Sequence, residues 1–306
     1  MQRKNDKAMF ERRRNTGNSR SWTRDEESVL LTNLRYESFD INTLQELFPY
    51  RSKPSIRSKV RKFRIKHDLF GSTYRDKKQD FTRKCAELIL PKTVFEAYAG
   101  AGHQTVIWSE YASKIFASDK LDGKLGQFTS EVFNSGFSIG KKSNKWTQFN
   151  SISGKEIVFY EGDALDAAVE LKYHGFKVDV LDLDTCGSTL PLLPILVALT
   201  KPKYLLITHG EFHSVRFGRD DVLRRVLVSR NIQESSVGLS VEDLKKELDR
   251  AVKLSTLRSH NETSDSAWAE LIDETWLGKK GQGLLRRLYK ITKPQATSDC
   301  LNSLMV

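Results

Sequence analysis

The stretch that decides the fold reads Val94-Phe-Glu-Ala-Tyr-Ala-Gly-Ala-Gly-His-Gln-Thr105. Its apolar first half predicts a short buried strand. Gly100 and Gly102 then allow the backbone to turn sharply and to approach a ligand closely, where a side chain would collide. A helix that begins near His103 points its unpaired N–H groups at the same ligand. The stretch therefore predicts a strand, a ligand-binding turn and a helix.

Four more strands are predicted after this turn, and helical patterns separate them. The expected strands cover residues 114–118, 156–160, 178–183 and 204–208. Strands that alternate with helices indicate an α/β fold with a doubly wound parallel sheet. Such a sheet binds ligands at the carboxyl ends of its strands.

Two acidic residues stand at these strand ends. Asp119 ends the second strand, where a carboxylate can accept hydrogen bonds from both ribose hydroxyls of an adenosyl ligand. Asp163 follows the third strand and is expected beside the adenine edge of that ligand. Either residue could instead cap the helix that comes after it.

The order of the motifs is Glu-x-x-x-Gly-x-Gly, then Asp119, then Gly-Asp-Ala, then Asp-Leu-Asp. It resembles the class I S-adenosylmethionine-dependent methyltransferases over roughly residues 85–292. The resemblance implies a Rossmann-like doubly wound methyltransferase sheet with S-adenosylmethionine as its cofactor. A nicotinamide-cofactor Rossmann domain is the alternative, but it expects a third glycine where Thr105 stands. The cofactor-binding residues that the resemblance implies are Glu96, Tyr98, Gly100, Gly102, Asp119 and Asp163.

The expected methyl-acceptor motif is Asp182-Leu-Asp-Thr-Cys-Gly-Ser-Thr-Leu-Pro191. It is similar to the Asp-x-Asp-Pro-Phe-Gly-Ser-Pro stretch of tRNA guanosine dimethyltransferases, and more loosely to the Asp-Pro-Pro-Tyr of amino-methylating DNA enzymes. The resemblance implies that Asp182 or Asp184 accepts hydrogen bonds from an exocyclic amine. This would align the nitrogen lone pair with the methyl group.

The motif departs from both patterns at two positions, because Thr185 replaces the proline and Cys186 the aromatic residue. Stacking on an extruded base would then fall to Phe212, His213 or Tyr98. Cys186 also allows covalent catalysis, in which a thiolate adds to C6 of a pyrimidine and activates C5. A buried, unreactive cysteine is the alternative.

Charge is concentrated near the N-terminus. The net charge is +11, and residues 1–80 hold 20 Lys and Arg against 11 Asp and Glu, a surplus of nine. This distribution predicts a polyanionic partner whose phosphates contact the N-terminal part. Residues 1–20, which contain little apolar material, are instead expected to form a disordered basic tail.

Three short helices are predicted within residues 21–66. Ser21 or Thr23 can cap the first helix, and a cationic third helix over residues 55–65 carries an apolar stripe. Trp22-Thr-x-x-Glu26 and Arg51-Ser-x-x-x-Ile-Arg-Ser-Lys59 resemble the Myb/SANT-like helix-turn-helix domains. The resemblance implies that the last helix enters the major groove, while a bundle that binds protein is the alternative. The implied nucleic-acid-binding residues are Arg51, Lys53, Arg57, Lys59, Arg61 and Lys62.

The remaining segments complete a two-domain arrangement. Residues 67–80 are expected to be a linker, residues 81–292 the methyltransferase domain and residues 293–306 a C-terminal tail. Within the larger domain, a loop over residues 135–155 is expected to cover the cleft, and its lysines and Trp146 either hold a substrate backbone or are solvated. Residues 218–280 are predicted to be helical, with Trp268, Leu271, Ile272 and Trp276 as a core stripe, and residues 284–291 to be a late strand.

Several classes of protein are not expected. The three cysteines have neither the spacing of metal ligands nor that of a disulfide framework, which fits a reducing, intracellular setting. The sequence suggests no membrane span, no signal peptide and no metal, and leaves the oligomeric state open.

The sequence as a whole predicts methyl transfer from S-adenosylmethionine to a base of DNA, because helix-turn-helix modules mostly recognise duplex DNA. An enzyme that modifies tRNA or another RNA is the alternative, favoured by the Asp-Leu-Asp-x-x-Gly-Ser motif. A third hypothesis is a DNA-binding regulator without enzymatic activity. Its methyltransferase fold would have decayed at Thr185-Cys186.

Overall fold

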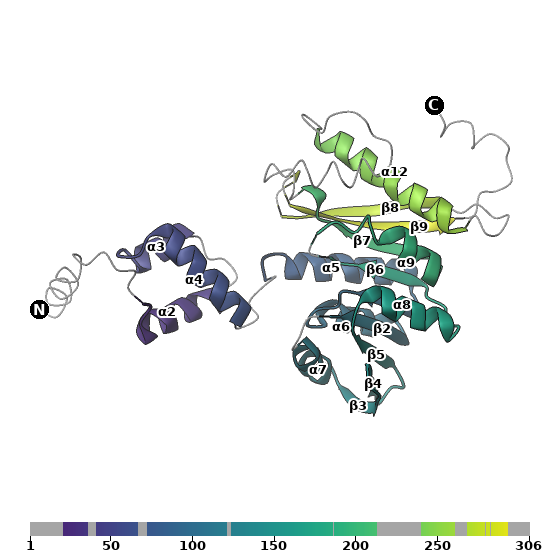
Figure 1. Ribbon diagram of the computed structural model, residues 1–306, viewed down its shortest axis with the longest axis horizontal. Coiled ribbons are helices and arrows are strands. Elements are labelled where there is room, and N and C mark those ends of the chain that lie inside the picture. The colour runs from purple at the N-terminus through teal and green to yellow at the C-terminus, as the bar shows by residue number, and fades with distance from the viewer. Residues whose placement is uncertain are drawn as a thin grey trace, which may run out of the picture. The chain divides into compact units, whose positions relative to one another are not determined.

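The structure is a computed structural model that divides into two compact units, residues 1–73 and 74–306 (Figure 1). None of the helices in its described part combines the length and apolar character of a membrane span. Both predicted tails, residues 218–239 and the first five residues of the predicted linker (67–71) lie outside the described residues. The described residues are 21–35, 41–66, 72–120, 124–185, 187–212, 240–260, 268–278, 280–281 and 283–292.

The described residues of the first unit form three helices at the places where the sequence predicts them. They are α2 (Arg24–Arg35), α3 (Ile41–Leu47) and α4 (Lys53–Lys66). Seven apolar side chains from these helices and the adjoining turn form a buried cluster that includes Leu30, Leu44 and Ile56. The similarity to Myb/SANT-like domains stays a prediction.

Thr23 provides the cap of α2. Its hydroxyl accepts the N–H of Glu26 at 3.2 Å, while its own N–H donates to Glu26 Oε2 at 2.8 Å. This reciprocal pair satisfies two N–H groups that the start of a helix otherwise leaves without partners. Of the two caps that the sequence allowed, the structure therefore uses Thr23.

Three of the predicted nucleic-acid-binding residues, Arg51, Lys53 and Lys59, form contacts inside the first unit. Arg51 is only 9 % exposed and donates from Nε and Nη2 to Glu26 at 3.1 and 2.8 Å. Its guanidinium lies 4.8 Å from the centre of the Trp22 ring. Lys59 forms an ion pair with Glu27. Lys53 is exposed but donates from Nζ to Asn42 Oδ1 at 3.0 Å, and Arg57, Arg61 and Lys62 are also exposed.

The second unit is built on one sheet of nine strands within its described residues. The strand order is β3-β4-β5-β2-β1-β6-β7-β9-β8. Five neighbouring strands are parallel, and they lie where the sequence predicts them, which confirms the doubly wound α/β sheet. They are β1 (Thr93–Ala97), β2 (Lys114–Asp119), β5 (Glu156–Glu161), β6 (Val180–Leu183) and β7 (Tyr204–His209).

Helices cover both faces of this sheet (Figure 1). One face packs against α5 (Ser72–Ile89), α6 (His103–Tyr111) and α7 (Lys124–Asn134). The other packs against α8 (Ala164–Tyr173), α9 (Leu193–Thr200) and α12 (Val241–His260). Each face forms its own apolar core, as expected when strands are buried on both sides.

The sheet has more strands than the sequence predicts, because the expected loop over residues 135–155 is largely a hairpin. The hairpin consists of β3 (Phe137–Lys142) and β4 (Trp146–Ser151), which pair antiparallel at one end of the sheet. Five of the six residues of β3 are exposed, so its composition is that of a loop. A strand at the edge of a sheet buries few of its side chains, so its sequence shows only a weak alternation of apolar and polar residues.

At the other end, the predicted helical stripe at Trp268 to Trp276 is wrong. Residues Trp268–Leu277 form strand β8, which pairs antiparallel with β9 (Leu284–Thr292), the predicted late strand. The register shifts between Leu271 and Asp273, and such a bulge breaks the two-residue alternation of a strand. The apolar positions consequently repeat at helical spacing.

The predicted linker is also partly wrong, because α5 begins at Ser72. Its first turns are rich in charged residues and carry few apolar ones, so their composition is that of a solvent-exposed linker. Helical geometry nevertheless brings Lys78 and Thr82 to the same side as the buried Cys85 and Ala86.

We expect Arg51→Ala to destabilise the first unit by about 1–3 kcal/mol, because it removes hydrogen bonds to Glu26 and uncovers Trp22. Arg57→Ala removes an exposed cation from the same domain and should cost less than about 0.5 kcal/mol. Hydrogen exchange of the amides of α2 and α4 in the full chain measures both effects. Equal exchange in the two variants would contradict an internal role for Arg51.

Candidate functional site

The glycine turn after β1 has the geometry that the sequence predicts. Gly100 and Gly102 have φ angles of +57° and +88°, which side-chain-bearing residues rarely adopt. A Cβ atom on Gly102 would lie 2.8 Å from the ring of Phe128, whereas a Cβ on Gly100 would meet nothing within 4 Å. Gly102 is therefore required for packing against α7, and Gly100 faces open space.

Asp119 connects this turn to its neighbours. Its Oδ2 accepts the N–H of Gly100 at 2.9 Å, and its backbone carbonyl accepts the N–H of Gly162 at 3.0 Å. The ends of three adjacent strands, β1, β2 and β5, are thereby held together. Four of the six predicted cofactor residues, Gly100, Gly102, Asp119 and Asp163, belong to these strand ends.

Asp163 caps the helix that follows it, which is the alternative role that the sequence allows for this residue. Its Oδ1 accepts the N–H of Leu165 at 2.9 Å, and Asp163 is the N-cap of α8. Its other oxygen lies 3.4 Å from Nζ of Lys120. Burial, followed by the charges of Asp163 and Asp119, raises the pKa of the Tyr98 phenol.

The first turn of α6 follows the glycine turn directly. Its N-cap residue is Gly102, which has no side chain that could cap the helix. The Oε1 atom of Gln104 is buried and accepts no hydrogen bond from the described residues. Helix N-termini of this kind attract polar and anionic groups of a ligand.

Glu96 belongs to β1, directly before the glycine turn. It is buried, and its carboxyl accepts the hydroxyl hydrogen of Thr105 in the first turn of α6. Burial, followed by the charge of Asp182 on the adjacent strand, raises the pKa of Glu96 well above its usual value. Glu96 therefore supports the helix that follows the turn.

Asp182 is completely buried. Its carboxylate accepts Nε1–H of Trp108 at 2.8 Å, and Nη2 of Arg286 donates to both of its oxygens at 3.0 and 2.8 Å. Arg286 also donates to Thr208 and Thr82. Burial raises the pKa of Asp182, an effect that Arg286 opposes without cancelling. The structure thus places Asp182 inside an ion pair beneath the site.

Asp184 follows Asp182 by two residues and lies directly after the carboxyl end of β6. Its side chain is 14 % exposed, and its Oδ2 lies 2.6 Å from Nζ of Lys78 on α5. Burial would raise the pKa of Asp184, but the charges of Lys78 and Arg286 outweigh it, and the pKa is lowered. Of the two acids Asp182 and Asp184, only Asp184 is both partly exposed and lowered in pKa.

The acceptor loop is fixed by contacts with the end of β7. Ser188 Oγ donates to Glu211 Oε1 at 2.6 Å, and Glu211 Oε2 lies 3.6 Å from Nδ1 of the buried His209. A Cβ atom on Gly210 would lie 2.6 Å from the carbonyl oxygen of Gly187, so the two backbones touch. These contacts determine the position of the loop.

The sequence suggests Cys186 as a nucleophile, and Phe212, His213 or Tyr98 as a stacking surface. Cys186 and His213 lie outside the described residues. Phe212 is buried and packs edge-on against Trp276, with 4.7 Å between ring centres, so it belongs to the core. The described residues contain no group of three His, Cys, Asp or Glu side chains that could hold a metal ion.

No family model matches the sequence, and no curated protein matches it. Among solved structures, the chain is similar to Trm1 from Pyrococcus horikoshii in complex with S-adenosyl-L-methionine. The TM-score is 0.55 and the identity 15 %, over 70 % of this chain and 54 % of that chain. The chain has a methyltransferase fold. It spans about half the length of the Trm1 chain.

Two O-methyltransferase structures are similar at lower scores. TomG from Streptomyces achromogenes, solved with SAM, gives a TM-score of 0.42 and 13 % identity over 70 % of this chain and 79 % of that chain. The enzyme from Bacillus cereus, solved with SAH, gives 0.43 and 11 % over 70 % and 80 %.

The methyltransferase fold brings three residues to the site that sequence reasoning missed. Lys78 was assigned to a linker, Arg286 to an ordinary late strand, and Trp108 was not singled out. A signal existed for Lys78, because it stands four residues before Thr82 on one helical face. For Arg286 there was only an unusual Arg-Arg pair inside an apolar strand, which indicates a buried charge that needs a partner.

We expect Asp182→Asn and Asp184→Asn to affect stability very differently. Asp182→Asn leaves Arg286 buried without its counter-charge and should cost about 3–5 kcal/mol. Asp184→Asn, at the edge of the site, should cost about 1 kcal/mol or less. Urea denaturation of the full chain, followed by circular dichroism, compares them. Equal losses in both variants would show that the two acids share one role.

Proposed function

We propose that this chain transfers a methyl group from S-adenosylmethionine to an exocyclic amine of a nucleic-acid base. One observation carries the proposal: the ends of four neighbouring strands bring the Gly100–Asp119 hydrogen bond and the ionised Asp184 to the same edge of the sheet. In doubly wound sheets this edge is where ligands bind.

The residues at this edge fit an adenosyl ligand. Gly100 leaves open space, the first turn of α6 has no side-chain cap, and Gln104 Oε1 is a buried acceptor without a partner among the described residues. Asp119 and Asp163 supply carboxylates for ribose hydroxyls and for the adenine edge. When bound, the cofactor supplies a methyl group on a positively charged sulfur.

Asp184 would hold the methyl acceptor. An ionised carboxylate accepts hydrogen bonds from an exocyclic amine and so orients its nitrogen. Formation of the N–CH₃ bond accompanies cleavage of the S–CH₃ bond, and the amine then loses one proton. Asp184 can take up this proton and pass it to water, because its side chain reaches the surface. Lys78 keeps the carboxylate ionised before the substrate binds.

Two nucleic acids are candidates for the substrate. The exposed cations Arg57, Arg61 and Lys62 on α4 support duplex DNA, since a basic helix can contact phosphates in the major groove. The acceptor motif supports RNA through its similarity to tRNA guanosine dimethyltransferases. A decayed, non-enzymatic regulator is the outcome if the cofactor does not bind.

We expect Asp119→Ala to weaken binding of S-adenosylmethionine by about 10-fold or more, because it removes a charged hydrogen-bond acceptor at the ribose position. Asp166→Ala is the matched control: Asp166 is an exposed acid in the first turn of α8. Calorimetry measures both affinities. Undetectable binding by the unaltered chain would instead support the decayed regulator.

We expect labelled methyl groups to enter either duplex DNA or tRNA, at an exocyclic amine. Asp184→Ala should lower the rate by about 100-fold or more through loss of alignment, while Asp166→Ala should not change it. Nucleosides released by digestion and separated by mass spectrometry identify the atom that carries the methyl group.

Label at C5 of a pyrimidine would assign the chemistry to Cys186 instead of Asp184. Label in neither nucleic acid, together with normal cofactor affinity, would remove the substrate part of the proposal and retain the cofactor part.

A further inference from the structure

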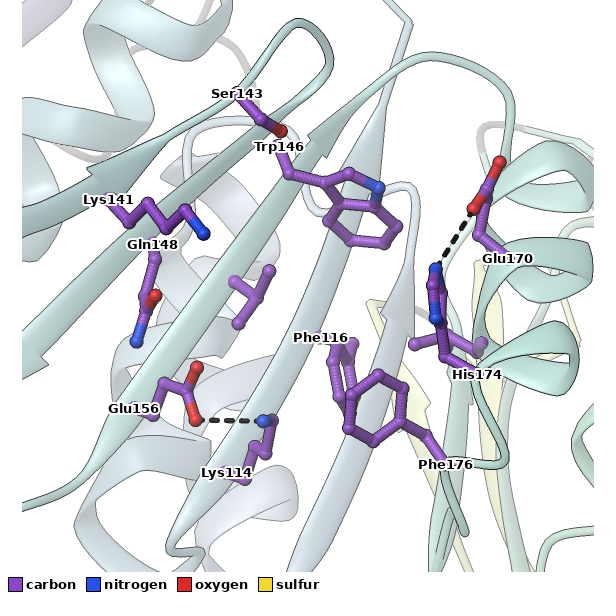
Figure 2. Close-up of a pocket in the computed structure, with 12 residues that line it drawn as sticks. Lys114, Phe116, Lys141, Ser143, Trp146, Gln148, Glu156, Glu170, His174 and Phe176 are labelled. Carbon is purple, nitrogen blue, oxygen red and sulfur yellow. Dashed lines mark ion pairs between the residues drawn. The ribbon is translucent and has the colours of Figure 1, made fainter.

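A cavity of about 310 Å³ lies on the face of the sheet that carries α8 (Figure 2). Phe116 of β2 and Val158 of β5 contribute to it from the sheet, Trp146 and Gln148 from β4, and His174 and Phe176 from the segment after α8. It exists because the hairpin β3–β4 extends the sheet beyond the helices that cover this face.

The lining of the cavity shares no residue with the site described above. Its residues on β2 and β5 lie in the first halves of these strands and include Lys114 and Glu156, whereas Trp146 of β4 pairs in register with Tyr160 near the carboxyl end of β5. Asp119 and Asp163, in contrast, lie at or beyond the carboxyl ends of these strands. None of the predicted cofactor or acceptor residues lines the cavity.

Aromatic rings form two sides of this cavity. In Figure 2 the indole of Trp146 projects over the space between the strands and His174, while the rings of Phe116 and Phe176 lie together, 4.9 Å between centres. Tyr160 supports Trp146 from the sheet, with 4.6 Å between ring centres. A planar ligand could therefore stack on Trp146 without moving the strand.

The polar residues in the cavity are suited to a neutral ligand. Glu156 is paired with Lys114 at 2.8 Å, and Glu170 lies 3.6 Å from the ring of His174. Gln148 and Ser143 add amide and hydroxyl groups around the same space. A nucleobase matches this surface, because it has two apolar faces and an edge of hydrogen-bond donors and acceptors.

The hairpin itself is cationic. Residues 137–151 contain Lys141, Lys142 and Lys145 and no acidic residue. Lys141 is exposed and lines the cavity, and its neighbour Lys142 is exposed on the same strand, so the hairpin offers cations for the phosphates that flank a bound base. Stacking platforms next to cationic grooves are characteristic of sites for single-stranded nucleic acid.

We propose that the hairpin β3–β4 and the end of α8 bind one unstacked base of single-stranded RNA, with the hairpin lysines on its phosphates. The proposal rests on the nucleic-acid part of the proposed function and names a second contact for that substrate. The volume lies near the lower end of the range for small-ligand pockets, about 300–1,000 Å³, which fits one nucleoside. RNA is preferred because its loops present unstacked bases, whereas duplex DNA keeps its bases stacked.

The test measures fluorescence anisotropy of a labelled single-stranded RNA of about 12 nucleotides with the full chain and without cofactor. Trp146→Ala should weaken binding about 5- to 150-fold, the range that corresponds to loss of one stacking platform, and Trp146→Phe should retain most of the affinity. The exposed pair Lys141→Ala/Lys142→Ala should lower the slope of log affinity against log salt by about 1.4. Lys172→Ala, an exposed lysine of α8 outside the cavity lining, is the control and should bind normally.

A second measurement identifies the contact directly. RNA that carries 4-thiouridine should cross-link to a peptide from the hairpin or the end of α8, and Trp146→Ala should abolish that cross-link. Cross-links confined to α2–α4, or unchanged affinity in both the Trp146→Ala and the double-lysine variants, would overturn the proposal. Tighter binding of a DNA oligonucleotide of the same sequence, or displacement of the RNA by equimolar AMP, would overturn the choice of single-stranded RNA.

The two proposals fail in distinguishable ways. Trp146-dependent RNA binding without methyl transfer would remove the proposed reaction and keep this site. Methyl transfer with unchanged RNA affinity in the hairpin variants would keep the reaction and remove the site. If Trp146→Ala does not fold, as judged by circular dichroism, the double-lysine variant and the cross-link decide the question.

Discussion

The buried ion pair between Asp182 and Arg286 is the constraint on which the candidate site at the carboxyl ends of the strands depends. Arg286 lies on the antiparallel strand β9, yet its guanidinium reaches Asp182 on β6, Thr208 on β7 and Thr82 on α5. A buried charge without its partner costs several kcal/mol, so these elements have only one favourable arrangement. The late antiparallel strand thereby determines where β6 ends and where Asp184 emerges.

The same ion pair explains why α5 belongs to the site. Glu96 and Asp182 are register neighbours on β1 and β6, and both carboxyls are buried. Burial and the nearby Asp182 raise the pKa of Glu96, which favours its neutral form. The two remaining acids, Asp182 and Asp184, are then balanced by Arg286 and Lys78. Lys78 comes from α5, so charge balance at the edge requires that helix.

The sequence was sufficient to predict the parallel strands and the glycine turn, because buried strands are apolar and the turn at Gly100 and Gly102 demands glycine. Prediction failed where the local signal was weak or misleading. The hairpin β3–β4 is polar because it lies at an edge, and the bulge in β8 imitates helical spacing. Which acid of the acceptor motif is buried could not be predicted, since it depends on Arg286, about a hundred residues later.

The Asp-x-Asp spacing places one acid, Asp182, inside β6 and a second acid, Asp184, directly after the end of that strand. Residues two apart on a strand point to the same side; Asp182 is still inside the sheet, whereas Asp184 has just left it. The proline of the related motif would stiffen the turn that follows. Here the hydroxyl of Thr185 donates to the carbonyl of Gly187 at 2.9 Å, and Gly187 abuts Gly210. A hydrogen bond and a backbone contact thus constrain the described part of this loop where the related motif has proline.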